Sequence, residues 1–375
     1  GLVFDPDFQT NGYFYLSYNV GVGNGDSLVA RYSVLSGTVD LGDPASAQTL
    51  FGPIPQSTDR HKGGDLEFGP DGMLYTSLGD GGIPDTAQDL SSPLGKLHRL
   101  DPGLPFPHAP ADNPFIGVAG AVPTTWALGF RNPWRFDVDP VTGDVFVGDV
   151  GESTWEEITR IGSGENGGWP CMEGTACANG TSCNCGDPSL ILPITQIGHG
   201  PPDGACAITG GLVYRGSAIP SLAGQYLFTD FCSASYYGVI DPSGPAPVRV
   251  DLTQDFQPGG ASLGLVVDFA RDQDGEVYFA RHNGATIWKL TARGGFDAYC
   301  ASEPNSSGAV ATISASGSAS IASANLMLEV NQLPAQALGF FLISGQRAHL
   351  PGFGGSQGIL CLDQPEVQAI IPRIR

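Results

Sequence analysis

The stretch DRHKGGDLEFGPDGMLYTSLGDGG, from Asp59 to Gly82, decides the fold. Leu66 to Phe68 alternates apolar and polar residues, which is typical of a short half-buried strand. Pro70-Asp71-Gly72 follows as a turn, in which glycine supplies the positive φ that a tight hairpin needs. Met73 to Leu78 is then predicted to be the returning strand. The segment is therefore predicted to form an antiparallel hairpin.

The same unit recurs along the chain. Five glycines each precede a predicted strand: Gly12, Gly72, Gly143, Gly224 and Gly275. A short apolar alternation lies before each of them, at 2–4, 66–68, 136–138, 212–214 and 267–269, and a third predicted strand follows at 30–32, 98–100, 159–161, 237–240 and 288–290. The glycines are between 51 and 81 residues apart, so loops of different length separate constant hairpins. A sandwich would not repeat one unit five times, so an all-β propeller is predicted.

Composition agrees with this fold class and excludes some functions. The chain has 375 residues with 54 Gly, 30 Pro and only 15% charged residues, which indicates a turn-rich all-β protein. It carries 38 acidic and 17 basic residues, and the net charge of −21 repels polyphosphates, so nucleic acid is not expected as a partner. No apolar run reaches the length of a transmembrane segment.

Eight cysteines predict an oxidising compartment, and hence a secreted, periplasmic or cell-surface protein. Four of them crowd into one loop, as Cys171, Cys177, Cys183 and Cys185. We expect disulfides there, with a zinc site as the alternative, although the spacing lacks the paired CxxC knuckles typical of zinc. The other expected pairs are Cys206 with Cys232 and Cys300 with Cys361.

A change of composition near residue 297 predicts two domains. Residues 1–296 would form the propeller, and residues 297–375 a small Ser/Ala/Gly-rich β module closed by the last disulfide. Disorder is the alternative for this tail. The run LGFFLIS at 338–344 is too apolar to lie in water, which favours the module.

Four motifs carry a resemblance to a known family. RHKGGDLEFGPDGMLYTSLGDGG, AQDL followed by Gly95-Lys96, WALGFRNPWRF at 126–136 and WEEITRIGSGENGGWP at 155–170 resemble the soluble glucose/sorbosone dehydrogenases. The resemblance implies a six-bladed propeller that binds pyrroloquinoline quinone and calcium and oxidises aldoses. GLVFDPDF resembles the family's second blade, so we expect the first blade to be missing and five to be present. WEEI and ITGG also resemble a subgroup, the hedgehog-interacting-protein propellers.

His61 is the predicted catalytic residue. An imidazole takes up a proton near neutral pH, so it can act as general base on a sugar hydroxyl while hydride leaves the carbon. Its place two residues before Gly63-Gly64 matches the family's catalytic histidine; the alternative is a loop histidine bonded to backbone. Antiparallel pairing brings Asp80 to the same end of the hairpin. Asp80 and Gln88 resemble positions that line the substrate and cofactor site, with ordinary turn formation as the alternative.

Arg131 and Asn132 lie between two apolar runs, and an arginine held there needs an anionic partner. The resemblance implies that this pair contacts the quinone; the alternative is an internal ion pair. It also implies a calcium site at Gly151, Glu152 and Glu156, where backbone and carboxylate oxygens are suitable hard ligands. The alternative there is a solvated acidic loop.

Two segments depart from the family pattern. The resemblance predicts a lysine at Thr229-Asp230-Phe231-Cys232 and an arginine pair at Leu265 to Phe269, and neither segment has a cation. The quinone carries three carboxylates, so charge-assisted contacts to it would be lost. Two functions therefore stand. One is an exported quinoprotein that oxidises the anomeric hydroxyl of aldoses, and the other is a non-catalytic secreted propeller that binds a glycan or a protein.

Overall fold

The computed structural model describes residues 1–38, 40–178, 183–233, 235–256, 265–282 and 286–291, and six strands between residues 312 and 370. The chain divides into two compact units, Gly1–Leu290 and Thr291–Arg375. The described strands of the second unit are β22 (Thr312–Ser316), β23 (Met327–Asn331), β24 (Phe341–Ile343), β25 (Arg347–Pro351), β26 (Ile359–Leu362) and β27 (Gln368–Ile370). They pair antiparallel as β22 with β23, β24 with β27 and β25 with β26. The predicted Cys300–Cys361 disulfide lies outside the described residues.

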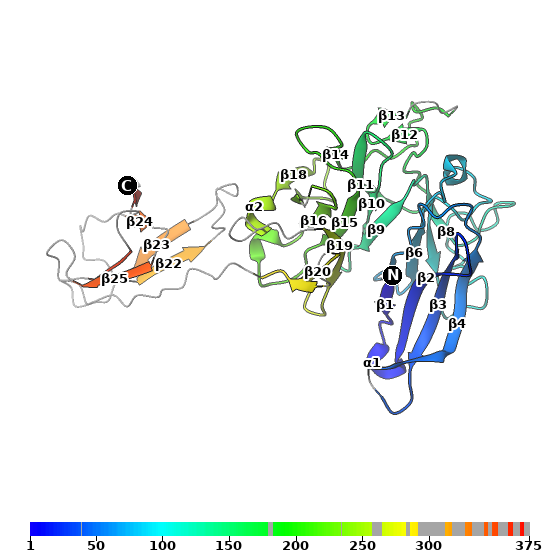
Figure 1. The fold of residues 1–375 in the computed structure, drawn as a ribbon, viewed down its shortest axis with the longest axis horizontal. Coiled ribbons are helices and arrows are strands. Elements are labelled where there is room, and N and C mark those ends of the chain that lie inside the picture. The colour runs from blue at the N-terminus through cyan, green and yellow to red at the C-terminus, as the bar shows by residue number, and fades with distance from the viewer. Residues whose placement is uncertain are drawn as a thin grey trace. The chain divides into compact units, whose positions relative to one another are not determined.

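The first unit consists of five antiparallel sheets that follow one another along the chain (Figure 1). The first has β1 (Leu2–Phe4), β2 (Tyr13–Val20), β3 (Asp26–Val34) and β4 (Gly42–Ile54), and the second has β5 (Leu66–Phe68), β6 (Leu74–Leu78), β7 (Lys96–Leu100) and β8 (Thr125–Leu128). The third has β9 (Pro133–Val138), β10 (Val145–Asp149), β11 (Trp155–Ile161) and β14 (Thr195–Gly198). The fourth has β15 (Ile208–Val213), β16 (Tyr226–Asp230), β17 (Tyr236–Ile240) and β18 (Val248–Asp251), and the fifth has β19 (Val266–Arg271), β20 (Val277–Arg281) and β21 (Thr286–Lys289).

Little else in the described residues is regular structure. The short helices are α1 (Phe8–Asn11), α2 (Thr253–Phe256) and the 3₁₀ helices η1 (Pro84–Ala87) and η2 (Pro220–Leu222), and a small hairpin joins β12 (Met172–Glu173) to β13 (Ala176–Cys177). No helix of the described chain is long and apolar enough to span a membrane.

The predicted hairpins are confirmed. All five turn glycines have positive φ, between 66° and 79°, and each precedes the second strand of its sheet. The fourth strands β4, β8, β14 and β18 were not predicted. They come from the connecting loops and lie at a sheet edge, where most residues of β4 and β18 are exposed and the sequence therefore shows no apolar alternation.

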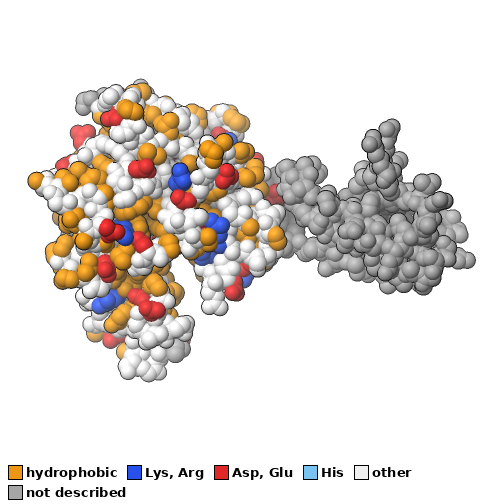
Figure 2. Space-filling view, turned by 180° about the vertical axis from the view of Figure 1, so that it is seen from behind, with side chains coloured by type: hydrophobic (Ala, Val, Ile, Leu, Met, Phe, Trp, Pro, Cys, Tyr) orange, Lys and Arg blue, Asp and Glu red, His pale blue; other side chains and the backbone are white. Residues whose placement is uncertain are grey.

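The sheets pack as the blades of a propeller. Their innermost strands contact one another in chain order, β1 with β5, β5 with β9, β9 with β15 and β15 with β19. The predicted all-β propeller is thus confirmed with five blades, and the six-bladed type implied by the family resemblance stays a prediction. In the space-filling view, basic side chains form small groups beside acidic ones, and no broad basic surface covers the visible face (Figure 2).

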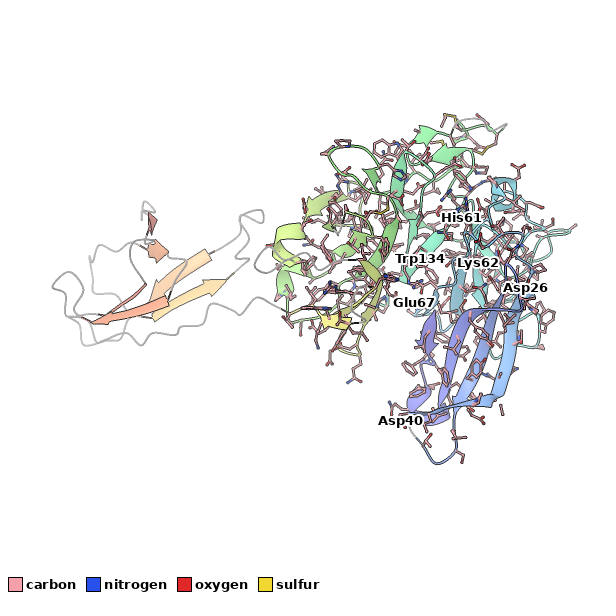
Figure 3. The ribbon with its side chains drawn as sticks, in the orientation of Figure 1. Asp26, Asp40, His61, Lys62, Glu67 and Trp134 are labelled. Carbon is pink, nitrogen blue, oxygen red and sulfur yellow. A yellow bond between two sulfur atoms is a disulfide. The ribbon has the colours of Figure 1, made fainter. Side chains whose placement is uncertain are left out.

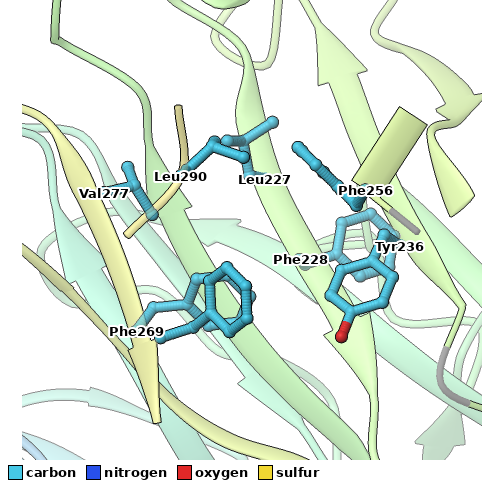
Figure 4. A pocket seen from close by; sticks show the side chains of 8 residues that line it. Leu227, Phe228, Tyr236, Phe256, Phe269, Val277 and Leu290 are labelled. Carbon is cyan, nitrogen blue, oxygen red and sulfur yellow. The ribbon is translucent and has the colours of Figure 1, made fainter. Parts of the chain in front are cut away.

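Apolar layers fill the spaces between neighbouring blades. The layer between the second and third sheets contains Tyr75, Trp126, Phe136 and Val147. Figure 4 shows the layer between the fourth and fifth sheets, where Phe228, Tyr236, Phe269 and other apolar side chains surround a gap of about 10 Å³. A gap of this size is no larger than one water molecule needs, so this layer is core and not a ligand site.

Charged side chains occupy the inner strands. Arg135 on β9 donates to Asp268 on β19 at 2.7 Å and lies 4.0 Å from Asp65, which precedes β5. Arg271 on β19 donates to Glu67 on β5 at 3.2 Å and also pairs with Asp137 on β9. Glu67 is labelled on this inner strand in Figure 3. Three blades are thus joined by ion pairs near the ring axis.

We predict that Glu67→Gln flattens the pH dependence of stability. Burial raises the pKa of Glu67 from its ordinary 4.5 to about 7, although Arg271 lowers it. The folded protein therefore binds more protons than the unfolded chain between these values, so this group makes stability fall as pH rises from about 4.5 to about 7. Urea unfolding at a series of pH values measures this slope.

The control is Asp40→Asn, which removes the same charge from an exposed loop of the first sheet (Figure 3). It should keep the wild-type slope, whereas Glu67→Gln should reduce it. A Glu67→Gln slope equal to that of the wild type would contradict the prediction.

Candidate functional site

His61 and Asp80 form the centre of the site, as the hairpin predicts. The Nδ1 atom of His61 lies 2.6 Å from Oδ1 of Asp80, which is buried just beyond β6. His61 has a φ of 49°, a left-handed conformation that costs a residue with a side chain about 1–2 kcal/mol. Such strain persists only where surrounding contacts impose it, and it is often found at functional sites.

Gly79 lets two loops meet beside this pair. A Cβ atom at Gly79 would collide with the carbonyl oxygen of His61 and lie 2.9 Å from that of Arg131. The amide of Asp80 donates to the same Arg131 oxygen at 2.8 Å. The loops that enter β5 and β9 are therefore in contact, and Arg131 of the third blade lies next to His61 of the second.

Trp169 completes the group and was not among the residues predicted from the sequence. Its indole N–H donates to Oδ2 of Asp80 at 2.9 Å, so the two carboxylate oxygens bind two different rings. The guanidinium of Arg131 lies over the Trp169 ring at 5.6 Å. The sequence offered one signal, because Trp169 stands in the quoted motif that ends in Trp-Pro.

Asp80 differs from its counterparts in the next two blades. Asp149 and Asp230 are the last residues of the second strands of their sheets, whereas Asp80 lies just beyond β6, and the carboxylates of Asp149 and Asp230 accept backbone amides. Asp149 binds the amides of Arg131 and Asn132 at 2.9 and 2.6 Å, and Asp230 binds four amides at 2.7–3.1 Å. Asp80 binds one amide, that of Gly82, and two side-chain rings. The aspartate after the second strand thus binds a histidine in the second blade, whereas in the next two blades it binds only backbone amides of loops.

These residues line a cavity of about 370 Å³. Arg60, His61, Arg131, Glu152 and Trp169 are on its wall with Asp80. The volume falls in the range of small-molecule sites, about 300–1,000 Å³. The cavity therefore offers a histidine, two arginines and three carboxylates, those of Asp59, Asp80 and Glu152, to one small ligand.

Arg131 and Asn132 behave differently from an internal ion pair. The Arg131 side chain donates to the carbonyl of Val150 at 3.1 Å, and in the described residues it forms no ion pair with a carboxylate. The Oδ1 atom of Asn132 is buried and has no hydrogen-bond partner there. The charge of Arg131 is thus available to an anionic ligand.

Gln88 does not line the cavity. Its amide donates to the Trp169 carbonyl at 2.6 Å and exchanges hydrogen bonds with Asn166 at 3.0 and 2.7 Å. Lys96, which is fully buried, donates to the carbonyls of Thr86, Ala87 and Leu94. Burial lowers the pKa of Lys96 to about 7. Lys96 thus holds the loop of Gln88, and Gln88 holds the backbone of Trp169.

The predicted calcium ligands differ in their surroundings. Glu152 lies on the cavity wall, whereas the buried Glu156 carboxylate contacts Nε2 of His199 at 2.7 Å and accepts the amides of Ile208 and Gly151 at 2.8 and 3.2 Å. Among the described residues, one group of three metal-binding side chains is close enough to share an ion, namely Cys206, Asp230 and Cys232. The two cysteines form a disulfide, so they are not thiolate ligands.

The structure pairs six of the eight cysteines. Cys171 is bonded to Cys183, Cys177 to Cys185 and Cys206 to Cys232, so disulfides and not zinc occupy the four-cysteine loop. The Cys206–Cys232 bond lies where the family resemblance predicts a lysine.

The comparisons with known proteins agree with this fold. The glucose / sorbosone dehydrogenase model matches residues 1–285. The HIPL1 protein of Arabidopsis thaliana is 29% identical over 359 residues, which is 76% of this chain and 52% of that protein. Human Hedgehog-interacting protein is 28% identical over 302 residues, 74% of this chain and 40% of that protein.

A solved structure of the PQQ-bound form of aldose sugar dehydrogenase from Streptomyces coelicolor has a TM-score of 0.58 at 22% identity and covers 78% of each chain. The chain spans about half the length of the curated relatives it matches. Since the family model covers three quarters of the sequence and the fold is the same, this chain belongs to the glucose/sorbosone dehydrogenase family.

Proposed function

We propose that this chain oxidises the anomeric hydroxyl of an aldose with pyrroloquinoline quinone as cofactor. One observation carries the proposal, the His61–Asp80 pair on the wall of the cavity. A carboxylate only accepts hydrogen bonds, so the 2.6 Å contact assigns the proton to Nδ1 and leaves Nε2 as the base. Among the described residues Nε2 has no hydrogen-bond partner, so it is free to accept a proton from a ligand.

The cavity wall fits an anionic planar cofactor. Arg131 lines the cavity and has no carboxylate partner in the described residues, whereas Asn132 is not among the lining residues, although its buried amide oxygen has no donor there. Arg131 would supply charge for one carboxylate of the quinone. When bound, the quinone supplies the hydride acceptor. The Glu156 carboxylate is already bonded to His199 and to two backbone amides, so no step is assigned to calcium.

The chain's own residues then have separate tasks. His61 takes the hydroxyl proton at Nε2, and Asp80 stabilises the imidazolium that forms. Trp169 holds the second oxygen of Asp80, which keeps the carboxylate oriented. Because the dyad exists before any ligand enters, little reorganisation is needed at the moment of proton transfer.

A second function has specific support. A propeller that binds a glycan or an extracellular protein without catalysis is favoured by the fourth blade, where Asp230 and the Cys206–Cys232 disulfide replace the expected cation. Similarity to Hedgehog-interacting protein, named for a protein partner, points the same way. Under either function the three disulfides support an exported protein, which would be secreted, periplasmic or at the cell surface.

The first experiment tests turnover. The purified chain is loaded with the quinone, with and without Ca²⁺, and dye-linked oxidation of glucose and other aldoses is followed. We expect activity that His61→Ala lowers about 10²- to 10⁴-fold, the usual contribution of a general base, with little change in quinone affinity. No turnover at saturating quinone would exclude the dehydrogenase and leave the binding function. A His61→Ala variant as active as its parent would exclude the mechanism.

The second experiment tests Trp169 as a positioning residue. Trp169→Phe keeps an aromatic ring over which Arg131 can lie but removes the N–H that donates to Asp80. A hydrogen bond to a charged group contributes about 1.5–3 kcal/mol, so we expect kcat to fall about 10- to 100-fold while KM changes little.

The matched control is Trp134→Phe, which removes an indole N–H that donates to the Val267 carbonyl at 3.2 Å; Trp134 is not among the residues that line the cavity. That variant should lose stability but keep kcat. Equal effects of the two substitutions on kcat would mean that Trp169 acts only through the fold.

A further inference from the structure

Arg60 is exceptional among the cations of the first unit. In the described residues every other arginine and lysine side chain has a hydrogen bond, an ion pair or a ring contact, whereas the Arg60 side chain has none. Typical partners are carboxylates, as for Arg99 with Asp71 and Arg249 with Asp203. Since the chain has 38 acidic and 17 basic residues, carboxylates are in excess. Arg60 is exposed, so water can solvate its charge, but the absence of any carboxylate partner in so acidic a chain still calls for a reason.

The position of Arg60 supplies one, because this residue is on the wall of the cavity. Consecutive residues of an extended chain point to opposite sides, but the left-handed backbone at His61 interrupts that alternation. Arg60 and His61 both line the cavity as a result. The carboxylates of Asp59 and Glu152 lie on the same wall, and neither forms an ion pair with Arg60.

Two guanidinium groups on the cavity wall, those of Arg60 and Arg131, thus have no carboxylate partner in the described residues. In the sequence, Arg60 precedes His61 and Arg131 follows Asp80. A guanidinium presents a planar fork of N–H donors that matches a carboxylate in two parallel hydrogen bonds. A neutral sugar can accept hydrogen bonds from such a group but does not balance its charge. Two of them at one small cavity indicate a ligand with at least one carboxylate.

We propose that Arg60 binds a carboxylate of the molecule that occupies the His61 cavity. The proposal deepens the proposed function and in part rests on it, since the carboxylate can come from two sources. One is the quinone cofactor, and the other is an acidic sugar such as a uronate. Binding by Arg60 requires no rearrangement of the fold, because its side chain leaves no existing partner.

The experiment compares wild type with Arg60→Gln, Arg60→Lys and the control Arg160→Gln, which removes an exposed guanidinium that contacts Asp144 at 3.6 Å. Dissociation constants are measured by calorimetry for the quinone alone, for glucuronate and for glucose. We expect Arg60→Gln to weaken one carboxylate probe about 10- to 100-fold. Arg60→Lys should weaken it less, since lysine keeps the charge but not the fork, and Arg160→Gln should have no effect.

The outcomes separate the sources. Weaker quinone binding assigns Arg60 to the cofactor, and weaker glucuronate binding with unchanged quinone binding assigns it to an acidic substrate. Unchanged affinity for both probes in Arg60→Gln overturns the proposal, as does a wild-type protein that binds neither. A wild type that binds glucuronate through Arg60 but no quinone would overturn the proposed function and keep this inference. Thermal unfolding of Arg60→Gln should match wild type, because no contact is lost.

Discussion

The arrangement of the propeller depends on charges near its axis. Arg135 joins the third blade to Asp268 of the fifth and approaches Asp65 of the second, and Arg271 of the fifth joins Glu67 and Asp137. Apolar layers between blades stabilise the fold but are tolerant of small shifts, because dispersion and burial have no direction. Ion pairs with fixed partners do have direction. Removing the carboxylate of such a pair leaves a mostly buried arginine without its partner, which is destabilising.

The positions of the inner strands also determine where the residues of the site lie. His61 precedes β5 and Arg131 precedes β9, so the positions of these two strands determine where both residues lie. Gly79 allows the two loops to touch, because a side chain there would collide with the His61 carbonyl. Trp169 then reaches Asp80 across 89 residues of sequence. The charge cluster near the axis and the His61–Asp80 pair at the strand ends thus depend on the same placement of the inner strands.

Charged side chains also order the long loops around the cavity. Lys96 donates to three backbone carbonyls below the Gln88 loop. Oε1 of Glu173 accepts the four amides from Glu152 to Trp155, and Asp230 accepts four amides in the fourth blade. Buried backbone groups in loops need hydrogen-bond partners. One charged side chain can bind several of them, in place of the partners that a helix or a sheet would supply. Loops held this way can present His61 and Arg131 in a fixed geometry.

Short-range patterns in the sequence determined the hairpins, the five glycine turns and the meeting of His61 with Asp80. All of these depend on residues within about 20 positions of one another, where turn chemistry and strand alternation decide the outcome. The tertiary structure alone decided the rest. The fourth strands β4 and β18 are mostly exposed edges without an apolar pattern, Glu156 lies buried beside His199, and Trp169 binds Asp80. The tertiary structure also leaves Arg60 without a carboxylate partner in the described residues. Which residues meet across blades depends on how the sheets close around the axis, and no local pattern encodes that.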